Sequence, residues 1–282
     1  MIYVTGDTHG GFHRLGSKYF PQQKEMTRED YVAITGDFGG LWDGGDKDQY
    51  WLDWLNDKPF TTLFVDGNHE NFALLNALPE RRWNGGRVHE VREHVLHLMR
   101  GQVFSFGGLT WFTMGGAASH DIRDGILDPG EPDFQRQYWL MRRMRAMFRV
   151  KGVSWWPEEM PSGAEYQEAM ENLERVNWTV DCILTHCAPS SIVKRLNAGY
   201  GTDTLTDFLE TVRQRCSFAC WFFGHYHDNR IVDQNYKTNC TSRPDSALCN
   251  SFLIIHSCPM CDMAISPCNI PCLNKWKCSI CK

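Results

Sequence analysis

The chain has 282 residues, of which 42% are hydrophobic, 22% charged and 13% aromatic, and its formal net charge is −5. This composition excludes a disordered, collagen-like or membrane-spanning chain and indicates a soluble globular protein. The mild negative charge argues against a dedicated nucleic-acid binder, although a nucleic acid remains possible as a substrate.

The start of the chain bears on its compartment. Residues Met1 to Asp7 contain no basic leader, no apolar signal core and no cleavage site. No stretch approaches the ~20 apolar residues that cross a bilayer. We therefore expect a cytoplasmic location, no membrane partner, and thiols that stay reduced unless they hold a metal or do redox work, so disulfides are not expected.

Five short apolar runs are predicted to be strands, and each leads into a polar or glycine-rich cluster. Continuous apolar runs of this kind are typical of strands that are buried on both faces. The runs and their clusters are Ile2–Thr5 before Gly6–Gly10, Tyr31–Thr35 before Gly36–Gly40, Thr62–Val65 before Asp66–Glu70, Cys182–Leu184 before Thr185-His186, and Cys220–Phe223 before Gly224–His227.

Helices are predicted between these strands. They cover Asp46–Asn56, His69–Leu78, Ala164–Val176 and Asp203–Arg215, and a hairpin is predicted for Val103–Phe106 and Leu109–Thr113. Strands that alternate with helices indicate βαβ units and a layered α/β fold. All five polar clusters then lie at the carboxyl ends of strands, the edge at which open α/β sheets place their ligand sites. We expect the clusters to converge on one pocket.

Residues 117–165 interrupt this alternation and are predicted to cap the pocket. Within them Phe134–Lys151 has arginines and apolar residues at helical spacing, which predicts a basic amphipathic helix. Two readings stay open. The helix is a lid packed on the body of the protein, or it is a surface for a phosphate-rich substrate or partner.

The polar clusters contain carboxylates, imidazoles and one amide that together suggest a metal site. A single cluster could be a turn or a helix cap, but five clusters at strand ends supply a complete ligand set. Such nitrogen and oxygen ligands suit Mn, Fe, Zn or Ni. The candidates are Asp7, His9, Asp37, Asn68, His69, His186, His225 and His227.

Eight candidates are too many for one tetrahedral zinc ion. They fit two metal ions about 3.5–4 Å apart, which share a carboxylate and leave one histidine free for proton transfer. Such a pair of ions neutralises phosphoryl oxygens and brings the pKa of a bound water close to neutral. The favoured reaction is therefore attack of a metal-bound hydroxide on the phosphorus of a phosphomonoester or phosphodiester.

Five blocks of the chain resemble, in order, the signature blocks of the calcineurin-like metallophosphoesterases. The resemblance spans residues 1–233 and implies a four-layer α/β/β/α sandwich with two packed sheets. Within this family, the chain resembles uncharacterised bacterial and phage members. The blocks are Gly6-Asp7-Thr8-His9-Gly10, Gly36-Asp37, Gly67-Asn68-His69-Glu70, Thr185-His186 and Gly224-His225-Tyr226-His227.

The resemblance also implies roles for the matching residues. One metal would be held by Asp7, His9 and His227, and the other by Asn68, His186 and His225. Asp37 would bridge the two ions. His69 would stay off the metals and act at the scissile phosphate as a proton donor or as a stabiliser of charge.

The chain departs from the Ser/Thr protein phosphatases of this family. Those enzymes carry an Asp-Arg-Gly motif after the second aspartate and an arginine before Gly-Asn-His-Glu. Here the corresponding stretch is Asp37-Phe38-Gly39-Gly40, and Asp66 precedes Gly67. Protein phosphatase activity is therefore not indicated, and the substrate-binding residues stay unknown.

Cysteines concentrate at the end of the chain. Of twelve cysteines, eight follow residue 233, where the composition changes, so we predict a phosphoesterase domain over 1–233 and a Cys-rich tail over 234–282. In the tail, Cys258, Cys261, Cys278 and Cys281 have the C-x2-C…C-x2-C spacing of a structural zinc site. The tail either binds this additional zinc or is poorly ordered.

The resulting hypothesis is a binuclear-metal phosphoesterase that acts on a phosphate ester. The alternative is a binding module in which a catalytically weak metal fold contacts nucleic acid or a partner through the basic helix and the Cys tail. Ligand completeness discriminates between them, because a degenerate fold should have lost ligands.

Overall fold

Two β-sheets form the centre of the computed structural model, which describes residues 1–227, 230–232, 236–238 and 253–255. In the first sheet the strand order is β15 (Leu253–Ile255), β1 (Ile2–Thr5), β2 (Tyr31–Ile34), β3 (Thr61–Phe64), β6 (Val95–Leu98), β5 (Gly86–Arg92) and β4 (Glu80–Trp83). In the second it is β13 (Arg230–Ile231), β14 (Tyr236–Thr238), β12 (Cys220–Phe223), β11 (Cys182–Thr185), β8 (Leu109–Met114) and β7 (Gln102–Phe106). Strands β1, β2, β3 and β6 are parallel, as are β8, β11, β12 and β14.

Side chains of the central strands alternate between two buried faces. On β1, Ile2 and Val4 enter the core between the sheets, whereas Tyr3 enters the core on the outer side. On β12, Phe222 faces the same central core and Trp221 lies against the helices. Because both faces are buried, these strands have continuous apolar sequences.

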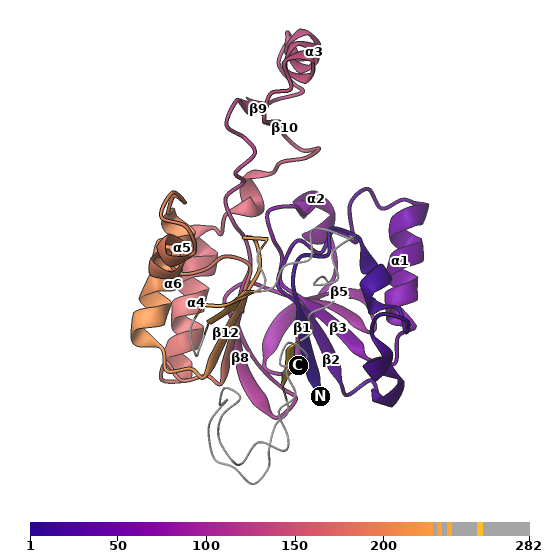
Figure 1. Cartoon of the computed structure of the whole chain (residues 1–282), viewed down its shortest axis with the longest axis vertical. Helices are drawn as coiled ribbons and strands as arrows, with labels where there is room; N and C mark the ends of the chain where they lie inside the picture. The colour runs from indigo at the N-terminus through magenta and orange to yellow at the C-terminus, as the bar shows by residue number, and fades with distance from the viewer. Residues whose placement is uncertain (228–229, 233–235, 239–252, 256–282) are drawn as a thin grey trace.

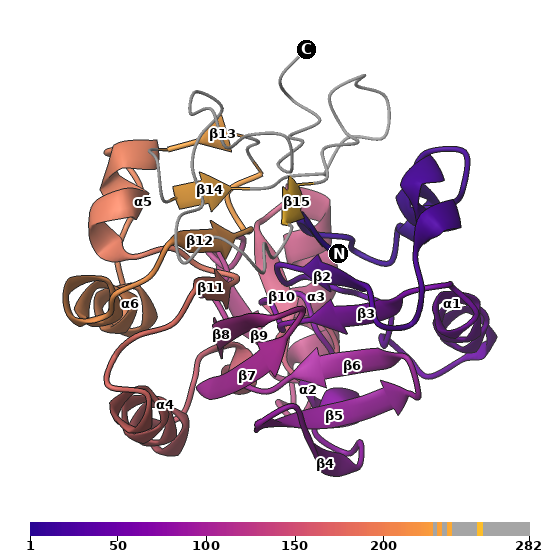
Figure 2. The ribbon, with the colours of Figure 1, turned by 90° about the horizontal axis from the view of Figure 1, so that it is seen from below.

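Helices cover the outer face of each sheet (Figures 1 and 2). The first sheet is covered by α1 (Asp46–Asn56), and the second by α4 (Gly163–Arg175), α5 (Ser190–Leu196) and α6 (Thr204–Arg215). Short 3-10 turns lie at Phe12–Leu15, Pro21–Glu25 and Pro157–Glu159. The four-layer α/β/β/α fold implied by the resemblance is confirmed.

The predicted strands are present, the helix predicted after the third strand is not, and β6 and α5 were not predicted. All five predicted strands, and the helices now labelled α1, α4 and α6, are present within about one residue of their predicted ends. The helix predicted over His69–Leu78 is wrong, because only α2 (Phe72–Leu75) is helical. Asn71 caps α2 by accepting the backbone N–H of Leu74, which leaves Asn68 and His69 in a loop.

The predicted hairpin is confirmed as the antiparallel pair β7–β8. Sequence reasoning missed the antiparallel pair of β4 and β5 at the far edge of the first sheet. Strand β4 contains Glu80, Arg81 and Arg82, all exposed. An exposed edge strand buries no alternating face, so it leaves no hydrophobic pattern to find.

The insertion forms an arm that projects from the body of the protein (Figure 1). This arm, residues 121–155, contains β9 (Gly125–Leu127), α3 (Phe134–Met144) and β10 (Phe148–Val150), and its two strands pair in parallel. The helix predicted to reach Lys151 ends earlier, since Arg145 takes a left-handed conformation with φ 54°. The prediction that it packs on the body is wrong, because α3, described along its whole length, contains no buried residue and Trp139 is 66% exposed.

Two strands beyond residue 233 belong to the sheets. Strand β14 pairs with β12, and β15 pairs antiparallel with β1. The four cysteines of the predicted zinc site lie outside the described residues, so that site stays a prediction. Within the described part of the chain, no helix has the length and apolar character needed to cross a bilayer.

Candidate metal centre

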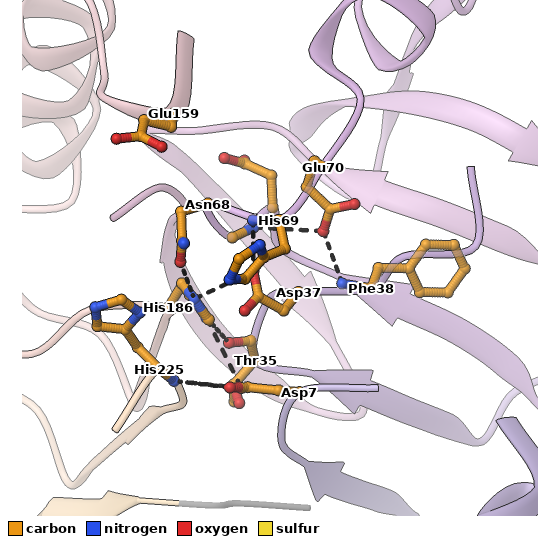
Figure 3. A network of polar contacts seen from close by, with 12 residues as sticks. Asp7, Thr35, Asp37, Phe38, Asn68, His69, Glu70, Glu159, His186 and His225 are labelled. Carbon is orange, nitrogen blue, oxygen red and sulfur yellow. Dashed lines mark hydrogen bonds and ion pairs between the residues drawn. The ribbon is translucent and has the colours of Figure 1, made fainter. Parts of the chain in front are cut away.

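The loops after β1, β2, β3, β11 and β12 meet at the carboxyl edge of the two sheets. Figure 3 shows side chains from all five loops gathered there. The first two loops are joined directly, since the backbone N–H groups of Thr8 and His9 donate to the Asp37 carbonyl at 3.1 and 2.7 Å. Parallel strands end at one edge, which is why residues from 7 to 227 share one site.

Backbone strain concentrates in these loops. Four of the predicted ligands lie in the left-handed region, with φ of 44° at His9, 45° at Asp37, 68° at His225 and 48° at His227. Such conformations cost about 1–3 kcal/mol each and cluster at functional sites. The fold therefore holds these side chains in conformations that a free chain would avoid.

Two motif glycines allow close packing around the carboxylates. A Cβ atom on Gly67 would lie 2.1 Å from Asp37 Oδ1, and one on Gly224 would lie 2.2 Å from Asp7 Oδ1. Any side chain at either position would displace a carboxylate. These glycines are therefore needed for the site itself.

Asp7, His9 and His227 form the first group of candidate ligands, with one ligand atom from each within 4.8 Å of the others. His227 Nε2 is 3.6 Å from Asp7 Oδ2, and His9 Nε2 is 3.6 Å from Asp37 Oδ2. The side chains of His9 and His227 are 35% and 47% exposed, whereas Asp7 is fully buried. The group is thus open to solvent on its histidine side.

The second group contains Asp7, Asp37 and His186, which are all buried. His186 Nε2 lies 3.5 Å from Asp37 Oδ1 and 3.3 Å from Asn68 Oδ1. Its Nδ1 lies 2.7 Å from the Thr35 carbonyl oxygen and donates to it. This bond orients the ring so that Nε2 faces the amide and the carboxylate.

Asp7 is common to both groups, and Asp37, a member of the second, also reaches His9 of the first. Asp37 Oδ1 faces His186 and also accepts the backbone N–H of His69 at 2.8 Å. Its Oδ2 faces His9, is buried and accepts no hydrogen bond from the residues that the structure describes. A buried carboxylate oxygen without a hydrogen bond is costly unless a cation neutralises it.

His225 lies beside these groups and contacts a histidine that sequence reasoning missed. Its Nε2 is 2.8 Å from His120 Nε2, and its backbone N–H donates to Asp7 at 3.2 Å. His120 follows β8, whose carboxyl end lies at the same edge as the other loops. The position of His120 after a predicted strand was the sequence signal that could have identified it as a site residue.

Two further residues at the base of the arm hold Asn68. Its Nδ2 donates to Ser119 Oγ at 3.2 Å, and Ser119 Oγ donates to Glu159 at 2.5 Å. The amide nitrogen is thereby occupied, so Oδ1 faces His186. Sequence reasoning missed both residues, because this contact joins positions 51 apart in the chain.

Glu70 holds the loop that carries Asp37. It is buried and accepts the backbone N–H groups of Phe38 at 2.7 Å and Gly39 at 3.3 Å, and Figure 3 shows it beside Phe38. The last residue of the Gly-Asn-His-Glu block is therefore a support for the second block rather than a ligand.

His69 belongs to neither ligand group within the described residues. Its ring Nδ1 lies 3.3 Å from Nη2 of Arg149, which also pairs with Asp121. A cavity of about 260 Å³ begins at His69 and His9 and extends between Trp42, Trp51 and Lys47. The cavity leaves room for a ligand beside the two groups.

The sequence model of the calcineurin-like phosphoesterase family matches residues 1–229. The chain belongs to this family. It is also similar to lariat debranching enzyme A of Xenopus laevis, with 23% identity over 206 residues that cover 68% of this chain and 33% of that protein. The chain thus spans about a third of the length of that curated relative. Members of the calcineurin-like family are metal-dependent and act on phosphate esters.

The electrostatics of the two carboxylates suit a calcineurin-like metal centre. Burial raises the pKa of Asp7 to about 7. Burial would also raise that of Asp37, but the charges of His186, His69 and His9 together lower its pKa to about 2. Without added positive charge, the two buried carboxylates do not ionise equally, and a metal cation would favour the ionised form of both.

Two of the histidines favour the neutral state that metals require, whereas at His186 burial lowers the pKa but the charges of Asp37 and Asp7 raise it above its usual value. Burial lowers the pKa of His9 to about 4, and burial followed by the charge of His186 lowers that of His225 well below its usual value. Neutral imidazole is the ligand form of histidine. Carboxylate, amide and imidazole donors, together with the unbonded Asp37 Oδ2, therefore fit divalent metal ions.

Proposed function

We propose that this chain is a binuclear metal-dependent phosphoesterase that hydrolyses a phosphomonoester or phosphodiester. The observation that carries the proposal is the position of Asp37, whose Oδ2 lies 3.6 Å from His9 Nε2 and whose Oδ1 lies 3.5 Å from His186 Nε2. A carboxylate in this position is suited to bridge two ions.

In this proposal the remaining ligands are divided between two ions. The first ion would be held by Asp7, His9 and His227, and the second by Asn68, His186 and His225. Two bound ions of Mn, Fe, Zn or Ni would neutralise phosphoryl oxygens and provide a hydroxide nucleophile near neutral pH.

His69 performs the proton transfer in this proposal. The centroid of its ring lies 5.3 Å from that of His9, and both residues line the cavity. From there His69 protonates the leaving oxygen or stabilises the charge on the phosphoryl group. Its backbone N–H donates to Asp37 Oδ1, which fixes the position of His69 relative to the carboxylate that is proposed to bridge the ions.

The test compares Asp37→Asn with the exposed control Asp57→Asn. Full-length protein is loaded with Mn(II) and assayed on p-nitrophenyl phosphate and bis(p-nitrophenyl) phosphate, and its metal content is measured. We expect two ions per chain in the wild type and the control. In Asp37→Asn we expect fewer ions and a rate reduced by more than about 100-fold. Full turnover in Asp37→Asn would contradict the bridging role.

The alternative, a binding module, has its own signature in the same experiment. It predicts metal binding without hydrolysis of either ester, together with a nucleic-acid affinity that falls steeply with salt. Against it, each of the eight predicted site residues is present at the carboxyl edge.

A further inference from the structure

The arm brings one arginine into contact with the candidate active centre. Arg149 is on β10, and its Nη2 lies 3.3 Å from His69 Nδ1. The same nitrogen pairs with Asp121, the first residue of the arm. The other arginines that follow or end α3, Arg142, Arg143 and Arg145, are exposed. Arg149 therefore differs from these neighbouring arginines in its contact with the candidate active centre.

The contact with His69 has a defined direction. A guanidinium has five N–H donors and no acceptor, so Arg149 donates and His69 Nδ1 accepts. In neutral His69 the proton then resides on Nε2. In this arrangement the ring has a fixed orientation and its Nε2–H can donate a hydrogen bond.

Arg149 also has donors to spare. Both of its contacts use Nη2, and within the described residues Nε and Nη1 donate to no partner. Its side chain is 23% exposed, so the guanidinium is partly accessible to solvent beside His69. The backbone is held in place, because the neighbouring Val150 N–H donates to Ser154 Oγ at 2.9 Å.

Planar guanidinium groups are well matched to phosphoryl oxygens, to which they donate paired hydrogen bonds. We propose, on the basis of the proposed function, that Arg149 binds a non-bridging oxygen of the substrate phosphoryl group while it orients His69. The arm thus contributes Arg149 to the active centre, and the guanidinium of Arg149 is the cation that binds the phosphate.

This role has a consequence for the substrate class. A phosphomonoester has up to one more negative charge at neutral pH than a diester, and a charged donor discriminates in favour of it. Arg149 therefore favours monoesters, whose terminal oxygens are all free to accept its N–H groups.

The experiment uses Mn(II)-loaded full-length protein in four forms: wild type, Arg149→Ala, Arg149→Lys and the control Arg143→Ala. The values of kcat and KM are measured on p-nitrophenyl phosphate and on its bis-ester. Binding of inorganic phosphate is measured by calorimetry, and metal content is checked in every form.

We expect Arg149→Ala to lose about 10- to 100-fold in kcat/KM on the monoester, and less on the diester. Phosphate affinity should fall while metal content stays constant. Arg149→Lys should recover part of the loss, since it restores charge but not the planar fork. Arg143→Ala should match the wild type.

Monoester kcat/KM within twofold of the wild type in Arg149→Ala, or unchanged phosphate affinity, would overturn the inference. A wild type that hydrolyses neither ester would instead refute the proposed function. In that case the calorimetric comparison of wild type and Arg149→Ala still decides whether Arg149 binds phosphate.

Discussion

Asp37 Oδ1 accepts the backbone N–H of His69 at 2.8 Å and lies 3.5 Å from His186 Nε2. One carboxylate oxygen is therefore shared between a proposed metal ligand and the residue proposed to act on the leaving group. A shift of Asp37 would move both. This coupling explains why the second and third blocks must be packed as closely as Gly67 allows.

His69→Ala should separate catalysis from metal binding. Because His69 lies outside both ligand groups, we expect metal content to stay at the wild-type level. The value of kcat should fall by about 10²–10⁴-fold, the usual contribution of a positioned acid or base. Metal analysis and steady-state kinetics on p-nitrophenyl phosphate check this, and loss of an ion would instead make His69 a ligand.

Ser119→Ala should weaken the second metal site selectively. The variant removes the acceptor that holds the Asn68 amide nitrogen at 3.2 Å, so Oδ1 is no longer oriented. Loss of such an orienting partner typically costs about 10- to 100-fold in metal affinity. A titration with Mn(II) should show one weakened and one unchanged site. The exposed Ser105→Ala is the control, and equal weakening of both sites would contradict the assignment.

Asp66→Asn should destabilise the fold. Asp66 is buried at the end of β3 and accepts two hydrogen bonds from Arg100, at 2.9 and 2.6 Å, and one from His97 at 3.0 Å. Removal of one partner of a buried ion pair costs about 3–5 kcal/mol in the free energy of unfolding. Chemical denaturation at pH 7 measures this cost, with Asp57→Asn as the exposed control.

The same pair gives stability a defined pH dependence. Burial raises the pKa of Asp66, but Arg100 and His97 more than offset this and hold it below its usual value. Its contribution is therefore complete above the unfolded-state pKa of about 3.9 and is lost as pH falls toward the folded-state pKa. The stability difference between wild type and Asp66→Asn should shrink below about pH 4. A difference that is constant from pH 7 to pH 2 would show that Asp66 does not titrate as described.

Cys187 should not take part in the reaction although it adjoins His186. Burial raises the pKa of its thiol to about 12, and its Sγ lies 3.1 Å from the Tyr226 hydroxyl. The reactive thiolate is then scarce at pH 8. Treatment of native protein with iodoacetamide should leave Cys187 unmodified by peptide mass spectrometry. Rapid labelling, or loss of turnover in Cys187→Ala with metal content intact, would contradict this.

Local patterns were sufficient for the five strands that precede the polar clusters and for the clusters themselves. Buried strands such as Cys220–Phe223 have apolar residues on both faces, and glycines follow four of the five predicted strands. The exposed strand β4 and the short α2 had no such signal. In α2 the decisive feature was one hydrogen bond from the Leu74 backbone to Asn71, which periodicity does not reveal.

The sequence by itself determined the α/β class, the site residues as candidates and the family resemblance, because these depend on residue types close together in the chain. Only the tertiary structure decided that Asp37 reaches both His9 and His186, that Ser119 and Glu159 hold Asn68, and that Arg149 reaches His69. Each of these contacts joins residues tens of positions apart. Their distance is set by how the sheets and the arm pack, and no local sequence pattern encodes it.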